Sequence, residues 1–170
     1  AGALVGYSMG DIVNCTVTGL DMKAGSDGSY VTLNSIGGLV GIQDGDTTVS
    51  HSRVSGKIEE TTKKGNVGGF VGTLVKGSSA KYCGADVSVE VTGNGRGIAV
   101  GGFVGIGNGT TADETLIENC YARGDITGAE YAGGFVGNIS GLNISNCYAK
   151  GDVSNCFVGA SFMGTDAASN

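Results

Sequence analysis

Five cysteines carry the most reactive side chains in this chain. Four of them occur in similar short motifs, and a serine takes the same place in a further copy of the motif: Cys15, Ser52, Cys83, Cys120 and Cys147. Cys156 lies outside this pattern and makes the total odd. Paired thiols form disulfides, and thiolates that converge on one point bind zinc. Either chemistry requires the chain to bring separate motifs together, so the arrangement of the motifs decides between a site and simple packing.

Histidine and carboxylates are the other groups that could catalyse a reaction or bind a cation. His51 is the only histidine, and a His-Glu-x-x-His zinc site needs two, so this segment contains no such site. Asp125 and Asp152 take equivalent places in two motifs and could form a carboxylate pair of the kind that acts on polysaccharides. Two pairs of loop acids could bind Ca²⁺ weakly: Asp44 with Asp46, and Asp113 with Glu114. Neither pair matches an EF-hand loop, so we expect no cofactor and leave weak calcium binding open.

Two tyrosines and two basic residues form the best candidate for recognition of a partner. Tyr121 and Arg123 belong to one motif, and Tyr148 and Lys150 take the same places in the next. Exposed aromatic rings can stack on sugars or contribute to a protein interface. Tyr121, Tyr148, Arg123 and Lys150 are therefore a candidate contact surface for a host protein or glycan. The alternative is that the two rings only stack on each other.

Composition and charge narrow the class of protein and its partners. Glycine makes up 34 of the 170 residues, yet 40% of the residues are hydrophobic and only 15% are charged. A disordered chain shows the reverse, so the glycines belong to an ordered structure. The net charge of −6 argues against nucleic acid as a partner. No apolar run approaches the ~20 residues that cross a bilayer, so we expect no membrane insertion.

The glycines mark an internal repeat. The pentamer Gly-Gly-Phe-Val-Gly occurs at 68–72, 101–105 and 133–137, with one change at 37–41 and degraded copies at 2–6 and 160–164. These spacings predict a single repeat domain over residues 1–170, with units that start near 2, 37, 68, 101 and 133 and a partial unit at 160. Because the chain opens directly with a repeat-like segment and no initiator Met, we interpret it as a fragment of a longer protein.

A second motif recurs inside each unit. Residues 117–126 read Ile-Glu-Asn-Cys-Tyr-Ala-Arg-Gly-Asp-Ile and match residues 144–153 almost letter for letter. Together, the pentamer and this motif resemble the GLUG-motif repeat of bacterial surface proteins, and the resemblance covers nearly the whole chain. That family includes adhesins and the non-catalytic regions of immunoglobulin-A-cleaving metallopeptidases. The resemblance implies a location at the bacterial cell surface or outside the cell.

The repeat also predicts an architecture. Units of about 30 residues cannot bury an apolar face alone, so neighbouring units must stack. Frequent glycine disfavours helix, and short apolar runs between turn residues favour strands. We therefore predict an all-β, right-handed parallel β-solenoid (β-helix) with about one coil per ~32-residue repeat and equivalent residues ~4.8 Å apart.

The stack predicts the direction of individual side chains. Cys120, Ala122 and Ile126 should face inward with their equivalents Cys147, Ala149 and Val153, and the residues between them should face outward. One interior column should contain Leu4, Leu39, Phe70, Phe103, Phe135 and Phe162. Asn14, Asn119 and Asn146 should lie at a turn, because asparagine tolerates the left-handed conformation.

Stacking in register changes how the chemical candidates are interpreted. Cysteines in register run parallel, with Cβ atoms ~4.8 Å apart where a disulfide needs about 3.8 Å, and a linear column does not converge on zinc. We therefore expect small apolar thiols that fill the interior, and leave a bridge from Cys156 to Cys147 open. His51 stands where other units have asparagine, which predicts a turn residue. Asp125 and Asp152 alternate with cations and predict a surface charge ladder.

The sequence thus predicts no enzyme. We expect a non-catalytic segment of a surface or secreted protein, which acts as an adhesin or as a rigid stalk or binding scaffold and contacts adjoining domains of the same polypeptide. Its variable loops, especially 73–79 and 106–116, would lie on one face. One alternative is an accessory region of a secreted metallopeptidase. Another is a β-helix enzyme that acts on polysaccharides, which would need acids converging in a groove.

Overall fold

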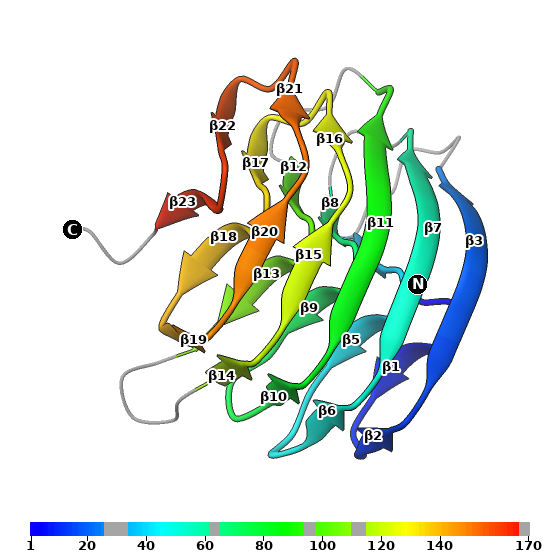
Figure 1. The fold of residues 1–170 in the computed structure, drawn as a ribbon, viewed down its shortest axis with the longest axis vertical. Helices are drawn as coiled ribbons and strands as arrows, with labels where there is room; N and C mark the ends of the chain where they lie inside the picture. Colours follow the sequence, from blue (N-terminus) through cyan, green and yellow to red (C-terminus); the bar gives the residue numbers. More distant parts are fainter. Residues whose placement is uncertain (26–33, 62–64, 94–97, 110–114, 167–170) are drawn as a thin grey trace.

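The computed structural model describes the chain except for residues 26–33, 62–64, 94–97, 110–114 and 167–170. Within the described residues, all the regular secondary structure is β-strand, and neighbouring strands pair in parallel. Each repeat makes one coil, and successive coils stack to form four sheets (Figure 1). The predicted parallel β-solenoid is therefore confirmed. No described helix is long and apolar enough to cross a membrane.

The pentamer sheet contains the strands that begin at the fourth residue of each pentamer. Its strands, in spatial order, are β1 (Val5–Ser8), β5 (Val40–Gln43), β9 (Val71–Leu74), β13 (Val104–Asn108), β18 (Val136–Ser140) and β23 (Met163–Asp166). The short sheet follows along each coil, with strands β2 (Ile12–Val13), β6 (Thr48–Ser50), β10 (Ser79–Lys81), β14 (Thr115–Glu118) and β19 (Leu142–Ser145).

The long sheet is formed by the Cys-containing motif and lies at the front of Figure 1. Its strands are β3 (Thr16–Ala24), β7 (Arg53–Glu60), β11 (Gly84–Val91), β15 (Tyr121–Arg123), β16 (Ile126–Thr127), β20 (Tyr148–Lys150) and β21 (Val153–Ser154). In the last two coils the strand is interrupted at Gly124 and Gly151, which have φ values of 138° and 152°. A Cβ at Gly124 would lie 2.3 Å from the carbonyl oxygen of Val87, so this crowded point requires glycine.

The return sheet closes each coil. Its strands are β4 (Asn34–Gly37), β8 (Gly65–Gly68), β12 (Ile98–Gly101), β17 (Tyr131–Gly133) and β22 (Val158–Ala160). The first residue of each full pentamer ends a strand of this sheet, and the second and third residues turn the chain into the pentamer sheet. A Cβ on Gly101 would lie only 1.9 Å from the carbonyl oxygen of Val104, and one on Gly102 would lie 2.2 Å from that of Gly134 in the next coil. The repeated glycines therefore let the chain make a tight corner while the coils stay in contact.

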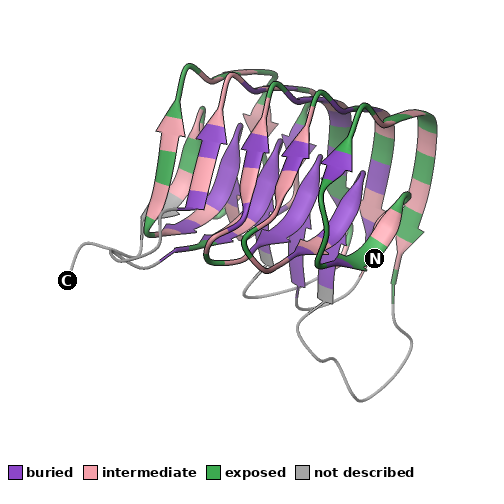
Figure 2. Ribbon diagram, turned by 90° about the horizontal axis from the view of Figure 1, so that it is seen from below, coloured by how far each residue is buried: buried purple, intermediate pink, exposed green. Residues whose placement is uncertain are grey.

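The predicted aromatic column fills the interior of the stack. Phe70, Phe103 and Phe135 are fully buried, with ring centroids 4.7 and 5.0 Å apart and planes within 5° of parallel. Phe162 stacks on Phe135 at 4.9 Å but is only half-buried, because it lies in the last coil. Leu39 is buried as predicted, whereas the prediction for Leu4 is wrong: 44% of its surface is exposed, because no coil precedes it in the structure. Figure 2 shows the same gradient, with buried residues concentrated in the middle coils.

The inward and outward assignments follow the prediction. Cys120, Ala122 and Ile126 are buried, and their equivalents in the last full coil, Cys147, Ala149 and Val153, pack against the core while remaining partly exposed. The strands that carry these motifs pair Ala122 with Ala149 and Ile126 with Val153. The residues between them point outward from the long sheet.

Candidate functional site

The long sheet places the candidate contact residues in two neighbouring coils. Strands β15 and β20 pair Tyr121 with Tyr148 and Arg123 with Lys150, so each motif contributes one aromatic and one basic side chain to the same face. The rings of Tyr121 and Tyr148 stack, with centroids 5.6 Å apart and planes 15° from parallel. The structure therefore brings both tyrosines and Arg123 together, and leaves Lys150 exposed beside them.

A glycine in the adjacent coil accommodates the ring of Tyr121. A Cβ at Gly84 would lie 2.2 Å from the ring carbon Cζ of Tyr121, so the ring occupies the space that a side chain on β11 would fill. In this position the Tyr121 hydroxyl donates a hydrogen bond of 3.1 Å to Oδ2 of Asp86. Partial burial, followed by the nearby negative charge of Asp86, raises the pKa of Tyr121 above its ordinary value.

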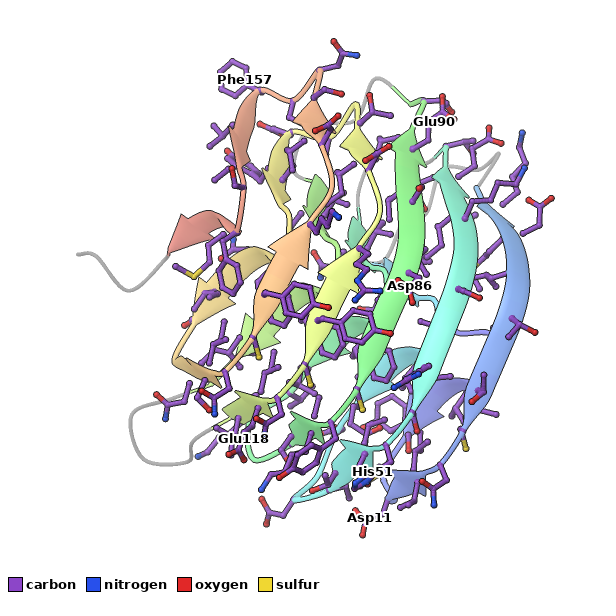
Figure 3. The ribbon with its side chains drawn as sticks, in the orientation of Figure 1. Asp11, His51, Asp86, Glu90, Glu118 and Phe157 are labelled. Carbon is purple, nitrogen blue, oxygen red and sulfur yellow. The ribbon has the colours of Figure 1, made fainter. Side chains whose placement is uncertain are left out.

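Arg123 links the two tyrosines to Asp86. Its guanidinium lies 4.7 Å from the ring centroid of Tyr121 and 5.7 Å from that of Tyr148, and Nη2 donates a hydrogen bond of 2.6 Å to the Tyr148 hydroxyl. Nη1 lies 3.8 Å from Oδ1 of Asp86, which Figure 3 places on the front of the long sheet. The hydrogen bond with Tyr148 raises the pKa of Arg123 further. We call these four residues (Asp86, Tyr121, Arg123 and Tyr148) the tyrosine cluster.

The rings, hydroxyls and guanidinium of the tyrosine cluster mostly contact one another. The ring of Tyr121 contacts Tyr148 and the guanidinium of Arg123, so it offers little free surface to a ligand. Tyr148 is 45% exposed and is the more exposed of the two rings, because Tyr121 is partly buried. This geometry matches the alternative interpretation, in which the rings stack on each other along the ladder.

The cysteine motifs form a column inside the corner between the short and long sheets. Cys83 and Cys120 are buried, and their backbone amides donate hydrogen bonds of 3.4 Å to Sγ of Cys120 and Cys147 in the following coils. Ser52 belongs to the same column, because its Oγ accepts the amide hydrogen of Cys15 at 3.0 Å. The thiols of Cys120 and Cys147 thus connect their own coils to the one before.

All five cysteines are free thiols, and Cys156 lies outside the column. The bridge from Cys156 to Cys147 that the sequence left open is absent. Hydrogen bonding with Cys147 and Cys83, together with burial, raises the pKa of Cys120 well above its ordinary value. The pKa values of Cys83 and Cys147 are lowered, chiefly by their hydrogen bonds with Cys120.

The residue before each column position forms a second row, which we call the corner row. It consists of Asn14, His51, Tyr82, Asn119 and Asn146, all with φ values between 51° and 55°. The predicted turn at the asparagines and at His51 is confirmed. The presence of Tyr82 in this row was not predicted, because tyrosine rarely adopts the left-handed conformation. Its position in the motif, directly before Cys83, was the available signal.

Tyr82 is the costly choice in the corner row, because histidine, like asparagine, is enriched in the left-handed conformation. Ordinary side chains in the left-handed conformation cost about 1–2 kcal/mol each, and asparagine costs less. The rings of His51 and Tyr82 stack with centroids 5.0 Å apart and planes 20° from parallel. A stacked pair contributes about 0.5–1.5 kcal/mol, so stacking offsets part of the cost at Tyr82.

The acidic candidates are spread over separate surfaces. Asp125 lies beside Asp152, and its Oδ1 accepts the backbone amide hydrogen of Asp152 at 2.9 Å, so the side chain bonds to the backbone of the next coil. Asp44 accepts hydrogen bonds from the Tyr7 hydroxyl and from the amide of Gly45, and the first of these lowers its pKa most. In the described part of the chain, no three His, Cys, Asp or Glu side chains gather to hold a metal ion. Asp113 and Glu114 lie outside the described residues.

Comparison with known proteins assigns the chain to a family. The model of the GLUG motif matches residues 32–59, 96–127 and 128–154, which together make up about half of the chain. The chain is 35% identical to halomucin of Haloquadratum walsbyi over 149 residues, and 30% identical to the immunoglobulin A1 protease of Streptococcus pneumoniae over 134 residues. These matches cover 80% and 76% of this chain but only 2% and 7% of those proteins. The matched repeats, each forming one coil of the stack, show that this chain belongs to the GLUG-motif family.

Proposed function

We propose that the chain is a non-catalytic binding scaffold, a segment of a secreted or cell-surface protein that holds contact residues on the outside of a rigid stack of coils. One observation supports this proposal above the others. The side chains that could take part in chemistry are arranged in rows along the stack, where neighbours in a row contact one another across adjacent coils. The tyrosines stack, the cysteines accept amide hydrogens, and Asp125 accepts the amide of Asp152.

A row of side chains suits presentation better than catalysis. Catalysis requires different groups to converge on one reacting atom, within hydrogen-bonding distance of it. A repeated coil instead places the same type of group at regular intervals along a surface, which favours contact with an extended partner. An adhesive role toward a host protein or glycan is part of the proposal, as is a location outside the cell, which the resemblance to surface proteins supports.

An accessory region of a secreted peptidase is the second candidate. The observation that favours it is the similarity to the immunoglobulin A1 protease, in which the matched region makes up 7% of the chain. In that case the stack would position a separate catalytic domain or its substrate. The two candidates agree that this segment itself performs no chemistry.

A binding assay and a turnover assay on the same protein test the proposal. The fluorescently labelled 170-residue chain is titrated onto epithelial cells and onto mucin-coated surfaces, and is also incubated with panels of polysaccharides and peptides. We expect saturable binding to at least one surface and no product from either panel. The Gly101→Ala chain, in which the corner between sheets is blocked, serves as the control for the folded scaffold and should not bind. Product formation that the Gly101→Ala chain lacks, or no saturable binding to any surface, would contradict the proposal.

A further inference from the structure

Two aromatic residues at the corner between the short and long sheets stand where this row otherwise carries asparagine. We infer that His51 and Tyr82 form a carbohydrate-contact site, in which the ring of a neutral sugar packs on the exposed aromatic pair and its hydroxyls bond to the neighbouring amides. The inference names a ligand class for the binding scaffold proposed above, and it rests on that role.

The pair is exposed and held in a fixed position. His51 and Tyr82 are both solvent-exposed, Tyr82 to 54%, and their rings stack. The backbone amide of His51 donates to the carbonyl of Lys81 at 3.1 Å, and that of Tyr82 donates to the carbonyl of Glu118 at 3.0 Å. Each ring is therefore attached to a backbone that is bonded to the next coil, so little flexibility is lost when a ligand binds.

The neighbours in the corner row leave the pair accessible and add polar groups. Asn119 follows Tyr82 in the row, and its side chain is shorter than a tyrosine ring. Tyr82 is 54% exposed, and its backbone amide bonds to Glu118, the residue before Asn119 in the next coil. A sugar packed on the Tyr82 ring would contact it through C–H groups and would offer a hydroxyl to the Asn119 amide.

The surroundings favour a sugar over a protein or nucleic acid. The residues in register beside the corner on the short sheet are Ser50, Lys81 and Glu118, all polar and partly exposed. Aromatic anchors in protein interfaces usually insert into apolar pockets from which water is excluded, and these neighbours provide none. The net charge of −6 disfavours a nucleic acid. A sugar has apolar C–H faces that can pack on the aromatic rings and hydroxyls that can bond to the polar neighbours, so it matches this surface.

The corner site is separate from the tyrosine cluster. Figure 3 shows His51 at the edge where the coil turns, whereas Asp86 lies on the front of the long sheet. Both pairs of rings stack, but Arg123 also lies over both rings of the tyrosine cluster and Tyr121 is partly buried, whereas both rings of the corner pair are exposed. The corner pair is therefore the better aromatic surface for a ligand. The backbone strain at Tyr82, which asparagine would lower, is the expected mark of a side chain kept for a contact.

The test replaces both aromatic residues with the residue that the row itself uses. The 170-residue chain and its His51→Asn/Tyr82→Asn variant are compared by saturation-transfer NMR and by titration with neutral oligosaccharides that end in galactose, glucose or mannose. We expect saturation transfer to the ring protons of at least one of these sugars with the unmodified chain. The double variant should bind that sugar at least about tenfold more weakly, which corresponds to about 1.4 kcal/mol, and should melt at the same or a higher temperature.

Two control variants separate the site from its surroundings. Tyr82→Phe keeps the ring and should bind within about threefold of the unmodified chain, and Tyr148→Ala removes a ring from the tyrosine cluster and should bind equally well. Unchanged binding by the double variant would overturn the inference, and so would the absence of saturation transfer to every sugar. Adhesion to cells that survives removal of their glycans and is lost in the double variant would indicate a protein partner instead, which overturns this inference while the scaffold proposal stands.

Discussion

Phe103 lies in the middle of the aromatic column, with a parallel phenylalanine on either side of it along the stack. Each of these rings contacts its counterparts above and below, so the loss of one ring leaves a cavity that the rigid coils cannot close. We expect Phe103→Ala to reduce the free energy of unfolding by about 3–5 kcal/mol, measured by chemical denaturation. Phe162→Ala removes a half-buried ring from the last coil and should cost clearly less. Equal losses at the two positions would show that the column is not the core of the stack.

The pentamer glycines can be tested in the same way. A Cβ on Gly101 would lie 1.9 Å from the carbonyl oxygen of Val104. The oxygen belongs to the backbone and the backbone fixes the direction of Cβ, so neither atom can move aside cheaply. Gly101→Ala should therefore prevent cooperative folding. Gly6→Ala is the matched control, because nothing lies within 4 Å of its Cβ position, and its stability should change by no more than about 0.5 kcal/mol. Circular dichroism during thermal unfolding separates the two outcomes.

Individual residues show how far the sequence determined the result. The column of Phe70, Phe103 and Phe135 could be predicted because identical residues at one repeat position must meet when coils stack in register. The partners of Tyr121 could not. Asp86 and Gly84 belong to a divergent copy of the motif, and only the lateral pairing of β11 with β15 shows that Tyr121 lies over one and bonds to the other.

At the scale of the element, the corner between the short and long sheets combines two rows with different chemistry. The corner row faces outward in the left-handed conformation, and the cysteine column directly after it faces inward. The sequence predicted this alternation at Asn119 and Asn146, where the motif is strongest. The motif places Tyr82 directly before Cys83, but the left-handed conformation of Tyr82 was not predicted, since the local preference of tyrosine opposes it.

The cysteine column predicts a pattern of thiol reactivity. Cys83 and Cys120 are buried, whereas Cys15, Cys147 and Cys156 are partly exposed. At about pH 8, where an ordinary cysteine is partly ionised, iodoacetamide should modify the three exposed thiols and spare the two buried ones, as read by mass spectrometry. Since the pKa of Cys147 is lowered, its alkylation rate should rise at a lower pH than that of an ordinary exposed cysteine. Modification of Cys120 at the rate of Cys156 in the folded chain would contradict the column.

At the scale of the whole molecule, the structure is a one-dimensional array in which each coil pairs only with the coil before it and the coil after it. Such an array should tolerate the loss of a complete unit. Deletion of residues 68–100 joins Val67 to Gly101, and these residues follow one another in register because Val67 pairs with Val100 and Gly68 with Gly101. We expect the shortened chain to fold cooperatively, with parallel β-structure by circular dichroism.

A deletion of about half a coil is the control for that experiment. Removal of residues 84–100 takes out β11 and most of β12, and would force the pentamer at 101–105 to follow Cys83 directly. This junction places a strand of the pentamer sheet where the long sheet should begin. The chain should therefore either remain unfolded or aggregate. If both deletions unfold the chain to the same extent, the coils are not interchangeable units and the array description is wrong.

The parallel pairing of the coils also limits how far this polypeptide can reach. Adjacent strands in a sheet are about 4.8 Å apart, so a unit of roughly 32 residues lengthens the stack by only that amount. An extended polyproline-like chain of the same length would cover on the order of 100 Å. Most of the residues in each added unit therefore run around the coil and widen the outer surface of the stack, and few contribute to its height. A protein built from such units gains a broad, evenly patterned wall, and it can project a distant domain only by using very long runs of repeats.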